Sequence, residues 1–379
     1  MGISGFLQFI KTKYPTLIHS EHISLYAYER VFIDISGYLY RYICSHGKQN
    51  HRWIYAMLQF LNTFKENKVI PVPVFDGKPP GEKSDEISMR REKRSQHQDR
   101  VTSLRESLQK YEAGDRSEEV TSVLYAELDR LEQRGQRMVR LMTTIRRANT
   151  EQVGDGSGSK RITSSDLTLL RDTLDTLIRQ HVTITEEDTL MLKDILTACG
   201  ISWVQAPSES ESFCSFLIRK QAGSAIVSCD SDCLAHLTPD VILDIELSGK
   251  CTRIELRDLL HHLQLNEQQL IDYAILMGCD YNRHLKKNKL GPVNALKLIH
   301  EYKTIEQIPE KVINKECLLY EKCRELFQPT YEVNWTLPVF KPDIELMQKW
   351  SNQLNIKMDY FQRLAATPSI SCQITFEEE

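Results

Sequence analysis

The stretch "AIVSCDSDCL", Ala225–Leu234, joins a short apolar run to two aspartates, Asp230 and Asp232, that are two residues apart. In an extended segment, side chains with this spacing point to the same side, so both carboxylates are expected together at the strand end. Aspartate after a strand also commonly starts a turn, and for this pair taken alone that simpler interpretation remains open.

Two earlier apolar runs end in the same way. "RVFIDIS" reaches Asp34 and "VIPVPVFDG" reaches Asp76, and the helical pattern "IYAMLQFLNTFKEN" precedes the second of these runs. Strands that alternate with helices predict an α/β fold with a mostly parallel central sheet flanked by helices. Ligands of such sheets bind outside the carboxyl ends of the strands, where these acids are expected to meet.

The segment "APSESES" supplies a second closely spaced pair of acids, Glu209 and Glu211. The spacing of Ser208 and Glu211 also fits a capping box that opens a helix, which is the structural alternative for this pair. The decisive question is therefore whether the acids of all these segments converge.

Composition narrows the class of protein. The chain has 379 residues, of which 41% are hydrophobic and 26% are charged, as is ordinary for a globular protein. It contains no apolar run long enough to span a bilayer and no signal-peptide pattern. Its ten cysteines include no Cys-x-x-Cys pair, which indicates reduced thiols in an intracellular protein. The net charge of −4 argues weakly against non-specific nucleic-acid binding, although local patches decide such binding.

A charged, strand-free region from about 84 to 147 separates the second and third apolar runs. Its apolar residues recur at spacings of three and four on both sides of a turn signal at Ala113–Asp115, which predicts a helical hairpin. A flexible linker at 153–160 and another amphipathic helix follow. The expected segments are the N-terminal part of the core, 1–83; the helical arch insertion, 84–185; the second part of the core, 186–270; a duplex-binding region, 271–310; and a C-terminal helical segment, 311–379.

Basic residues gather at the start of this insertion, among them Lys83, Arg90, Arg91 and Arg94. A charge run of this kind is usually a solvated face. Beside a group of acids that needs divalent cations, however, basic side chains can bind phosphate oxygens.

Taken together, the motifs resemble those of the flap endonuclease family, structure-specific 5′ nucleases related to the excision-repair nuclease XPG. The matching motifs are "MGISGF", "VFIDIS", "VFDGKPP", "APSESES", "CDSDCL" and "LMGCDY", in the family's order. The resemblance implies a centre of two Mg²⁺ ions, for which Mn²⁺ can substitute. Its expected ligands are seven acids: Asp34, Asp76, Glu209, Glu211, Asp230, Asp232 and Asp280.

The resemblance also implies roles for other residues. Lys83 and Arg90 match the two basic residues that contact the scissile phosphate. Tyr40 matches an aromatic residue that stacks on a base, although a core tyrosine is the alternative. Further DNA contacts are expected from Arg91, Arg94, Lys286, Lys287, Lys289 and Gly291. The last four lie in a segment that resembles the family's helix–turn–helix variant, where the loss of a glycine puts the potassium site of relatives in doubt.

The expected function is metal-dependent hydrolysis of phosphodiester bonds near the junction of 5′-flap or other branched DNA, in replication, repair or recombination. A 5′→3′ exonuclease on DNA or RNA is the enzymatic alternative, and a branched-DNA-binding scaffold is the non-enzymatic one. The ending "CQITFEEE" makes recruitment by a sliding clamp doubtful. The expected location is the nucleus or, since the unusual arch would suit a large DNA virus, a cytoplasmic replication site. No membrane partner is expected, and the oligomeric state stays open.

Overall fold

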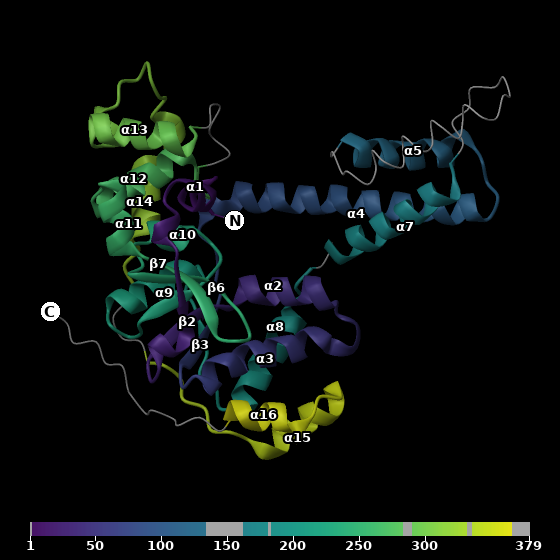
Figure 1. Cartoon of the computed structure of the whole chain (residues 1–379), viewed down its shortest axis with the longest axis horizontal. Helices are drawn as coiled ribbons and strands as arrows, with labels where there is room; N and C mark the ends of the chain where they lie inside the picture. The colour runs from purple at the N-terminus through teal and green to yellow at the C-terminus, as the bar shows by residue number, and fades with distance from the viewer. Residues whose placement is uncertain (1, 134–161, 181–182, 283–289, 332–335, 366–379) are drawn as a thin grey trace. The chain divides into compact units, whose positions relative to one another are not determined.

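The computed structural model describes residues 2–133, 162–180, 183–282, 290–331 and 336–365. The chain divides into two compact units (Figure 1). The first unit, called the core here, consists of Met1–Ser88 and Thr183–Glu379, and the second, called the helical unit, consists of Met89–Val182.

A seven-stranded sheet organises the core, and its strand order is β1-β7-β6-β5-β2-β3-β4. The five strands from β6 to β4 run parallel, and β7 and β1 add an antiparallel edge. The mostly parallel α/β fold expected from the sequence is thereby confirmed. The strands are β1 His19–His22, β2 Arg30–Asp34, β3 Ile70–Phe75, β4 Val204–Gln205, β5 Ala225–Val227, β6 Asp240–Ile245 and β7 Lys250–Glu255.

The sequence of β3 explains its place in the sheet. The Ile70 N–H donates to the Glu29 carbonyl at the edge of β2, so alternate residues of β3 face β2. Pro71 and Pro73, which have no N–H, fall on the other side. The pairing of β4 with β3 begins only at Val74, so the two prolines cost the sheet no hydrogen bond with β4.

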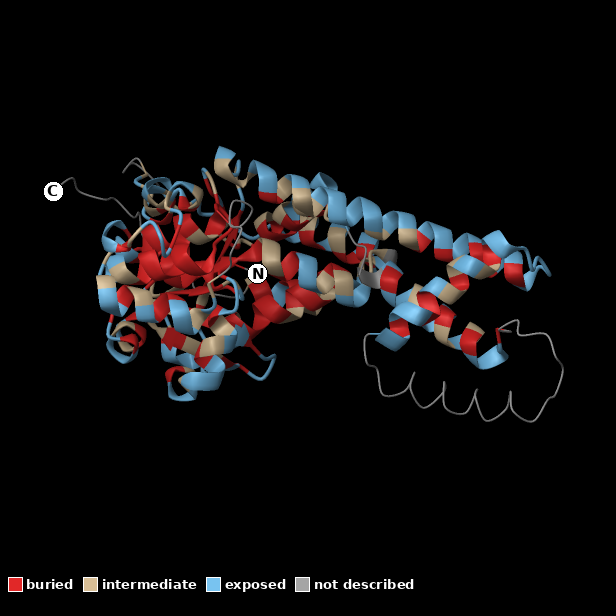
Figure 2. Ribbon diagram, turned by 90° about the horizontal axis from the view of Figure 1, so that it is seen from above, coloured by how far each residue is buried: buried red, intermediate tan, exposed pale blue. Residues whose placement is uncertain are grey.

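Helices cover both faces of the sheet. On one face α2 and α3 pack against β3, and α3 in turn contacts α16 (Figure 1). On the other face α9 packs against β2, β3 and β5. Helix α10 contacts both α9 and α12, and α12 in turn contacts α13 and α14. The buried residues are concentrated in the sheet and in the helix faces turned toward it (Figure 2). The parallel strands β2 and β5 therefore have protein on both sides, which explains their continuous apolar runs.

The core helices have the following bounds: α1 Phe6–Lys13, α2 Ile35–His46, α3 Arg52–Glu66, α8 Glu186–Ala198, α9 Ser210–Arg219, α10 Asp232–Ala235, α11 Leu256–Leu263, α12 Glu267–Met277, α13 Pro292–Tyr302, α14 Tyr320–Phe327, α15 Ile344–Leu354 and α16 Met358–Ala365. The 3₁₀ turns are η1 Pro15–Leu17, η2 Ile23–Tyr26, η3 Gln49–His51, η4 Gly81–Lys83, η5 Ile305–Gln307 and η6 Glu316–Leu318.

The helical unit is built from α4 Ser84–Glu112, which begins in the core, α5 Glu118–Gln133 and α7 Ser164–Gln180. The expected hairpin is present, and its turn contains Gly114 with a φ of 102°. Apolar residues of all three helices form a separate hydrophobic cluster: Val101, Leu104, Leu108, Tyr111, Val120, Leu124, Leu128, Leu170 and Leu177, with Ile162 before α7. The predicted linker at 153–160 lies outside the described residues.

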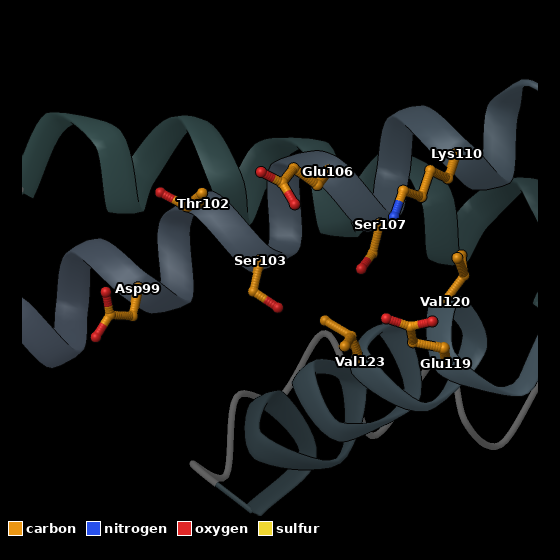
Figure 3. A pocket seen from close by; sticks show the side chains of 9 residues that line it. All are labelled: Asp99, Thr102, Ser103, Glu106, Ser107, Lys110, Glu119, Val120 and Val123. Carbon is orange, nitrogen blue, oxygen red and sulfur yellow. The ribbon is translucent and has the colours of Figure 1, made fainter.

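A groove between α4 and α5 carries mixed charge, with Asp99, Glu106, Glu119 and Lys110 among its lining residues (Figure 3). Among the helices that the structure describes, we find none with the length and apolar character needed to cross a bilayer.

Candidate metal centre

The ends of two neighbouring parallel strands bring the first two acids together. Asp34 is the last residue of β2, and Asp76 follows the last residue of β3. Ser210 connects them, because its Oγ lies 2.8 Å from Asp34 Oδ1 and 2.8 Å from Asp76 Oδ1. The Ser210 N–H also donates to Asp76 Oδ1, at 2.9 Å.

Glu209 and Glu211 stand at the N-terminus of α9. This helix starts at Ser210, and its N-cap Glu209 makes no side-chain capping hydrogen bond, so the alternative of a capping box is wrong. The helix start is held against the Asp76 loop by Gly77, whose N–H donates to the Ser208 carbonyl at 2.6 Å. A side chain at Gly77 would not fit, since a Cβ there would lie 2.1 Å from the Ala206 carbonyl oxygen.

The geometry of the Asp230–Asp232 pair differs from the expectation. Strand β5 ends at Val227, so the pair does not lie in an extended segment, and that part of the prediction was wrong. Instead, the Asp232 N–H donates to Asp230 Oδ1 at 3.1 Å, and α10 begins at Asp232. The turn interpretation is thus correct for the backbone. The carboxylate of Asp232 is nevertheless buried, and its Oδ1 has no hydrogen-bond partner among the described residues.

The third strand end is tied to the first by a serine. Ser228 Oγ donates to Asp34 Oδ2 at 3.0 Å and accepts from the Asp230 N–H at 3.1 Å. The N-terminal segment packs against the same place, because a Cβ on Gly2 would lie 1.8 Å from Asp230 Oδ1. Only a glycine fits there, and its φ of 81° also favours glycine.

Asp280 and Lys83 complete the group. Asp280 follows α12, and Lys83 is the last residue of η4. The Lys83 ammonium forms ion pairs with Glu209 and, at 3.7 Å, with Asp280. Tyr281 donates its hydroxyl proton to Glu209 at 2.7 Å. Lys83 is 15% exposed, so the structure buries a cation among the acids.

Burial and mutual repulsion raise the pKa values of Asp34, Glu211 and Asp232. Burial, followed by the charge of Asp76, raises the pKa of Asp34 to about 7. Burial, followed by neighbouring carboxylates, raises the pKa of Glu211 and that of Asp232 well above the usual range. Burial alone would lower the pKa of Lys83, but the surrounding carboxylates outweigh it and raise that pKa. The group therefore carries more negative charge than one lysine offsets, which is the electrostatic condition for binding cations.

These residues fit divalent cations by their chemistry. The donor set consists of carboxylate oxygens, which suit Mg²⁺ or Mn²⁺ better than zinc. The unpartnered Oδ1 of Asp232 is one acceptor ready for such an ion. In the described part of the chain, however, no three His, Cys, Asp or Glu side chains already surround a single point as ligands would. Ion binding therefore requires adjustment of some side chains, among them Glu209 and Asp280, which Lys83 now engages.

The residues expected to contact DNA lie in several places. Tyr40, on α2, is 38% exposed and is therefore not a core tyrosine, whereas Tyr38 is buried. Gly291 is the N-cap of α13, with Pro292 as the first helical residue. Lys286, Lys287 and Lys289 lie outside the described residues.

Arg90, Arg91 and Arg94 lie on α4 within the helical unit. Their distances from the acids therefore remain a prediction. Lys83 ends η4 and directly precedes α4, whereas Arg90 lies within α4.

Sequence reasoning missed the polar residues that link the acids, namely Ser210, Ser228 and Tyr281. In the sequence, these residues differ from other serines and tyrosines only in their position close to the acids. Such a position does not show in which direction a hydroxyl group points.

The chain is similar in sequence to known proteins over most of its length. Residues 1–97 match the XPG N-terminal domain, and residues 200–280 match the XPG I-region. The chain is 26% identical over 328 residues to the "Probable RAD2-like endonuclease 369L" of Invertebrate iridescent virus 6, covering 81% of this chain and 73% of the relative. It is 25% identical over 364 residues to flap endonuclease 1 of Homo sapiens, covering 89% and 79%.

Solved structures share the fold. Flap endonuclease-1 from Methanococcus jannaschii matches with a TM-score of 0.56 and 21% identity, over 92% of this chain and 95% of that one. The catalytic core of Rad2 in complex with DNA substrate matches with a TM-score of 0.57 and 16% identity, over 96% and 98%. Human GEN1 in complex with Holliday junction DNA matches with a TM-score of 0.56 and 13% identity, over 96% and 76%.

The fold and the site define a class of α/β protein with a partly buried acidic centre at the carboxyl edge of a mostly parallel sheet. Within that class, the chain is similar to the nucleases of the XPG and flap endonuclease family, whose N-terminal domain and I-region it matches over residues 1–97 and 200–280.

Proposed function

We propose that this chain is a metal-dependent 5′ nuclease that hydrolyses phosphodiester bonds near the junction of 5′-flap or other branched DNA. One observation carries the proposal: strand ends, helix starts and loops far apart in the sequence bring acids, several of them buried, and one partly buried lysine to one edge of the sheet. A protein that only binds DNA has little reason to keep acids that repel one another.

The proposed ligands of two Mg²⁺ ions, or of Mn²⁺ in their place, are Asp34, Asp76, Glu209, Glu211, Asp230, Asp232 and Asp280. Bound ions would supply activation of water and stabilisation of the attacking and leaving oxygens on phosphorus. The hydrogen bonds from Ser210 and Ser228 hold the first of these ligands in place.

Lys83 is proposed to contact the scissile phosphate. Its ammonium is paired with Glu209 and Asp280 here, and ions bound to those carboxylates would release it toward an anionic substrate. The family motif assigns the same task to Arg90, and we assign the helical unit Met89–Val182 as the arch that carries it. Tyr40 has the exposure that stacking on a base requires.

Duplex DNA is proposed to bind away from the cut. The N-terminus of α13, which begins directly after Gly291, would attract a phosphate through the positive end of the helix dipole. Lys286, Lys287 and Lys289 would add positive charge beside it. The relatives named above include proteins solved with a DNA substrate and with a Holliday junction, which supports branched DNA as the substrate class.

A substrate panel tests the proposal. The purified chain is incubated with 5′-flap, nicked, bubble, four-way-junction DNA and single-stranded RNA, each with Mg²⁺ or with EDTA. We expect cleavage of a branched DNA near its junction with Mg²⁺ and none with EDTA. Stepwise release of nucleotides from RNA or DNA ends, with no cut at a junction, would contradict the proposal in favour of an exonuclease. Binding without cleavage of any substrate would indicate a scaffold.

A further inference from the structure

Ser210 occupies an unusual position between the acids. It is fully buried, and its Oγ lies 2.8 Å from Asp34 Oδ1, 2.8 Å from Asp76 Oδ1 and 3.4 Å from Glu211 Oε2. These carboxylates come from β2, from the loop after β3 and from α9. One hydroxyl thus contacts acids from three separate segments of the core.

The hydroxyl has one proton and can donate it to one acceptor at a time. The backbone N–H of Ser210 gives Asp76 a second donor, and Ser228 gives Asp34 a second donor on its other oxygen. Whichever carboxylate the hydroxyl donates to, Asp34 keeps the hydrogen bond from Ser228 and Asp76 keeps the one from the Ser210 N–H. Each fixed carboxylate has further lone pairs, which a cation can use.

We propose that Ser210 is a positioning residue of the metal centre. Its hydroxyl holds the Asp34 and Asp76 carboxylates at a fixed separation, so that one oxygen of Asp34 and one oxygen of Asp76 are presented to the same divalent cation. The inference rests on the proposed function, since it assumes that these acids bind metal. Partners that orient metal ligands in this way commonly contribute 10–100-fold in metal affinity.

Ser212 is the matched control, because it lies two residues further along the same helix and is equally buried. Its hydroxyl donates to the Glu209 backbone carbonyl and pairs with the Tyr331 hydroxyl at 2.7 Å. In the described structure no hydrogen bond joins Ser212 to a carboxylate of the centre. Replacing it tests the cost of losing a buried hydroxyl in α9 without changing the proposed ligands.

The experiment measures Mg²⁺ binding directly, by isothermal titration of the full chain without DNA. Ser210→Ala is expected to raise the dissociation constant for Mg²⁺ by about 10-fold or more. Ser212→Ala is expected to leave it within about 2-fold, because its hydroxyl contacts a backbone carbonyl and a tyrosine only. Circular dichroism in EDTA checks that each variant is folded.

A second substitution, Ser210→Cys, keeps the side-chain size but offers only a weak donor, and it is expected to weaken Mg²⁺ binding as well. Unchanged Mg²⁺ affinity in a folded Ser210→Ala or Ser210→Cys protein would overturn the inference. Failure of both variants to fold would also overturn it, since Ser210 would then be a structural residue. Absence of Mg²⁺ binding in the wild-type chain would instead count against the proposed function itself.

Discussion

Lys83 shows at the level of one residue how the centre balances its charge. Its ammonium is mostly buried, pairs with Glu209 and Asp280, and lies 5.2 Å from the centre of the Tyr281 ring. In the absence of metal, its positive charge offsets part of the negative charge of these acids. The same position would place it beside a phosphate once metal ions take over the carboxylates.

Replacing Lys83 or Arg90 by alanine should slow the chemical step. We expect each variant to lose at least ~10²-fold in the single-turnover cleavage rate, which is the order for removing one electrostatic stabiliser. The affinity for DNA should change by less than ~10-fold, since a charge that acts mainly in the transition state contributes little to ground-state binding. Rapid-quench cleavage and fluorescence binding assays on a 5′-flap substrate measure the two quantities.

Arg91→Ala is the control for this pair, because Arg91 neighbours Arg90 on α4 without a proposed contact to the scissile phosphate. Its effect on the rate should be small. Equal rate losses for Arg90→Ala and Arg91→Ala would mean that the run of basic residues is only a positively charged surface.

At the scale of elements, Arg324 fastens α14 to α12 and η5. Its guanidinium binds both carboxylate oxygens of Asp272 at 2.7 Å and also pairs with Glu306. Asp272 is completely buried, whereas half of the Glu306 side chain is exposed. Because Asp272 is buried, its ion pair with Arg324 is important for the stability of α14, which follows the Asp280 loop in the chain.

Arg324→Ala should destabilise the core by about 3–5 kcal/mol, because it leaves the buried Asp272 carboxylate without its counter-ion. Urea denaturation followed by tryptophan fluorescence measures the loss. Arg363→Ala removes a half-exposed partner of Asp359 and should cost less than about 1 kcal/mol. Similar losses in the two variants would mean that Arg324 contributes no more than a surface charge.

His236, which closes α10, gives the core a dependence on pH. Burial lowers the pKa of its imidazole to about 3, and its Nδ1 lies 2.9 Å from the Phe327 carbonyl oxygen of α14. An unfolded histidine takes up a proton near pH 6.5, so between pH 6.5 and 3 the unfolded state binds more protons. The free energy of unfolding should therefore fall as the pH falls through this window.

His236→Asn removes the titrating ring and keeps an amide that can donate to the same carbonyl. Between pH 7 and pH 5, the wild-type chain should lose about 2 kcal/mol more stability than this variant. Urea denaturation at both pH values measures the difference. A loss that is the same in both proteins would show that His236 does not titrate upon unfolding.

At the scale of the whole molecule, the described part of the helical unit has a hydrophobic cluster of its own, separate from the one in the core. Leu124 is fully buried in the hydrophobic cluster of the helical unit. Leu124→Ala should destabilise that unit by about 2–5 kcal/mol, the usual cost of such a cavity. Limited proteolysis should then cut within Met89–Val182 first, whereas Ser122→Ala, at an exposed position of the same helix, should leave the pattern unchanged. Faster cleavage throughout the core would contradict the independence of the two units.

The sequence allowed most of the fold to be predicted, because β2 and β3 are continuous apolar runs that end at an acid. The meeting of Asp34 and Asp76 followed from a general property of parallel sheets, whose carboxyl ends share one edge. The turn at Asp230–Asp232 was only one of two interpretations, because the sequence did not show that β5 ends at Val227, three residues before Asp230.

The contacts inside the centre could not be predicted in the same way. Ser210 and Asp34 are 176 positions apart, so their hydrogen bond depends on how α9 is set against the sheet. The pairing of Lys83 with Glu209 depends likewise on the course of the loop after β3. Tyr38 and Tyr40 lie on the same helix, and the sequence does not show which of them is buried. In the structure it is Tyr38, which packs on Phe60 with 4.4 Å between the ring centres.

The most direct test of the central claim compares the wild-type chain with Asp230→Asn on a 5′-flap DNA. Single-turnover cleavage is measured with Mg²⁺, and binding of the same DNA is measured with Ca²⁺. We predict that the variant nearly loses cleavage and keeps its affinity for DNA, because loss of a ligand charge weakens the metal centre more than it weakens duplex contacts. Undiminished cleavage, or loss of binding in parallel with cleavage, would contradict the account.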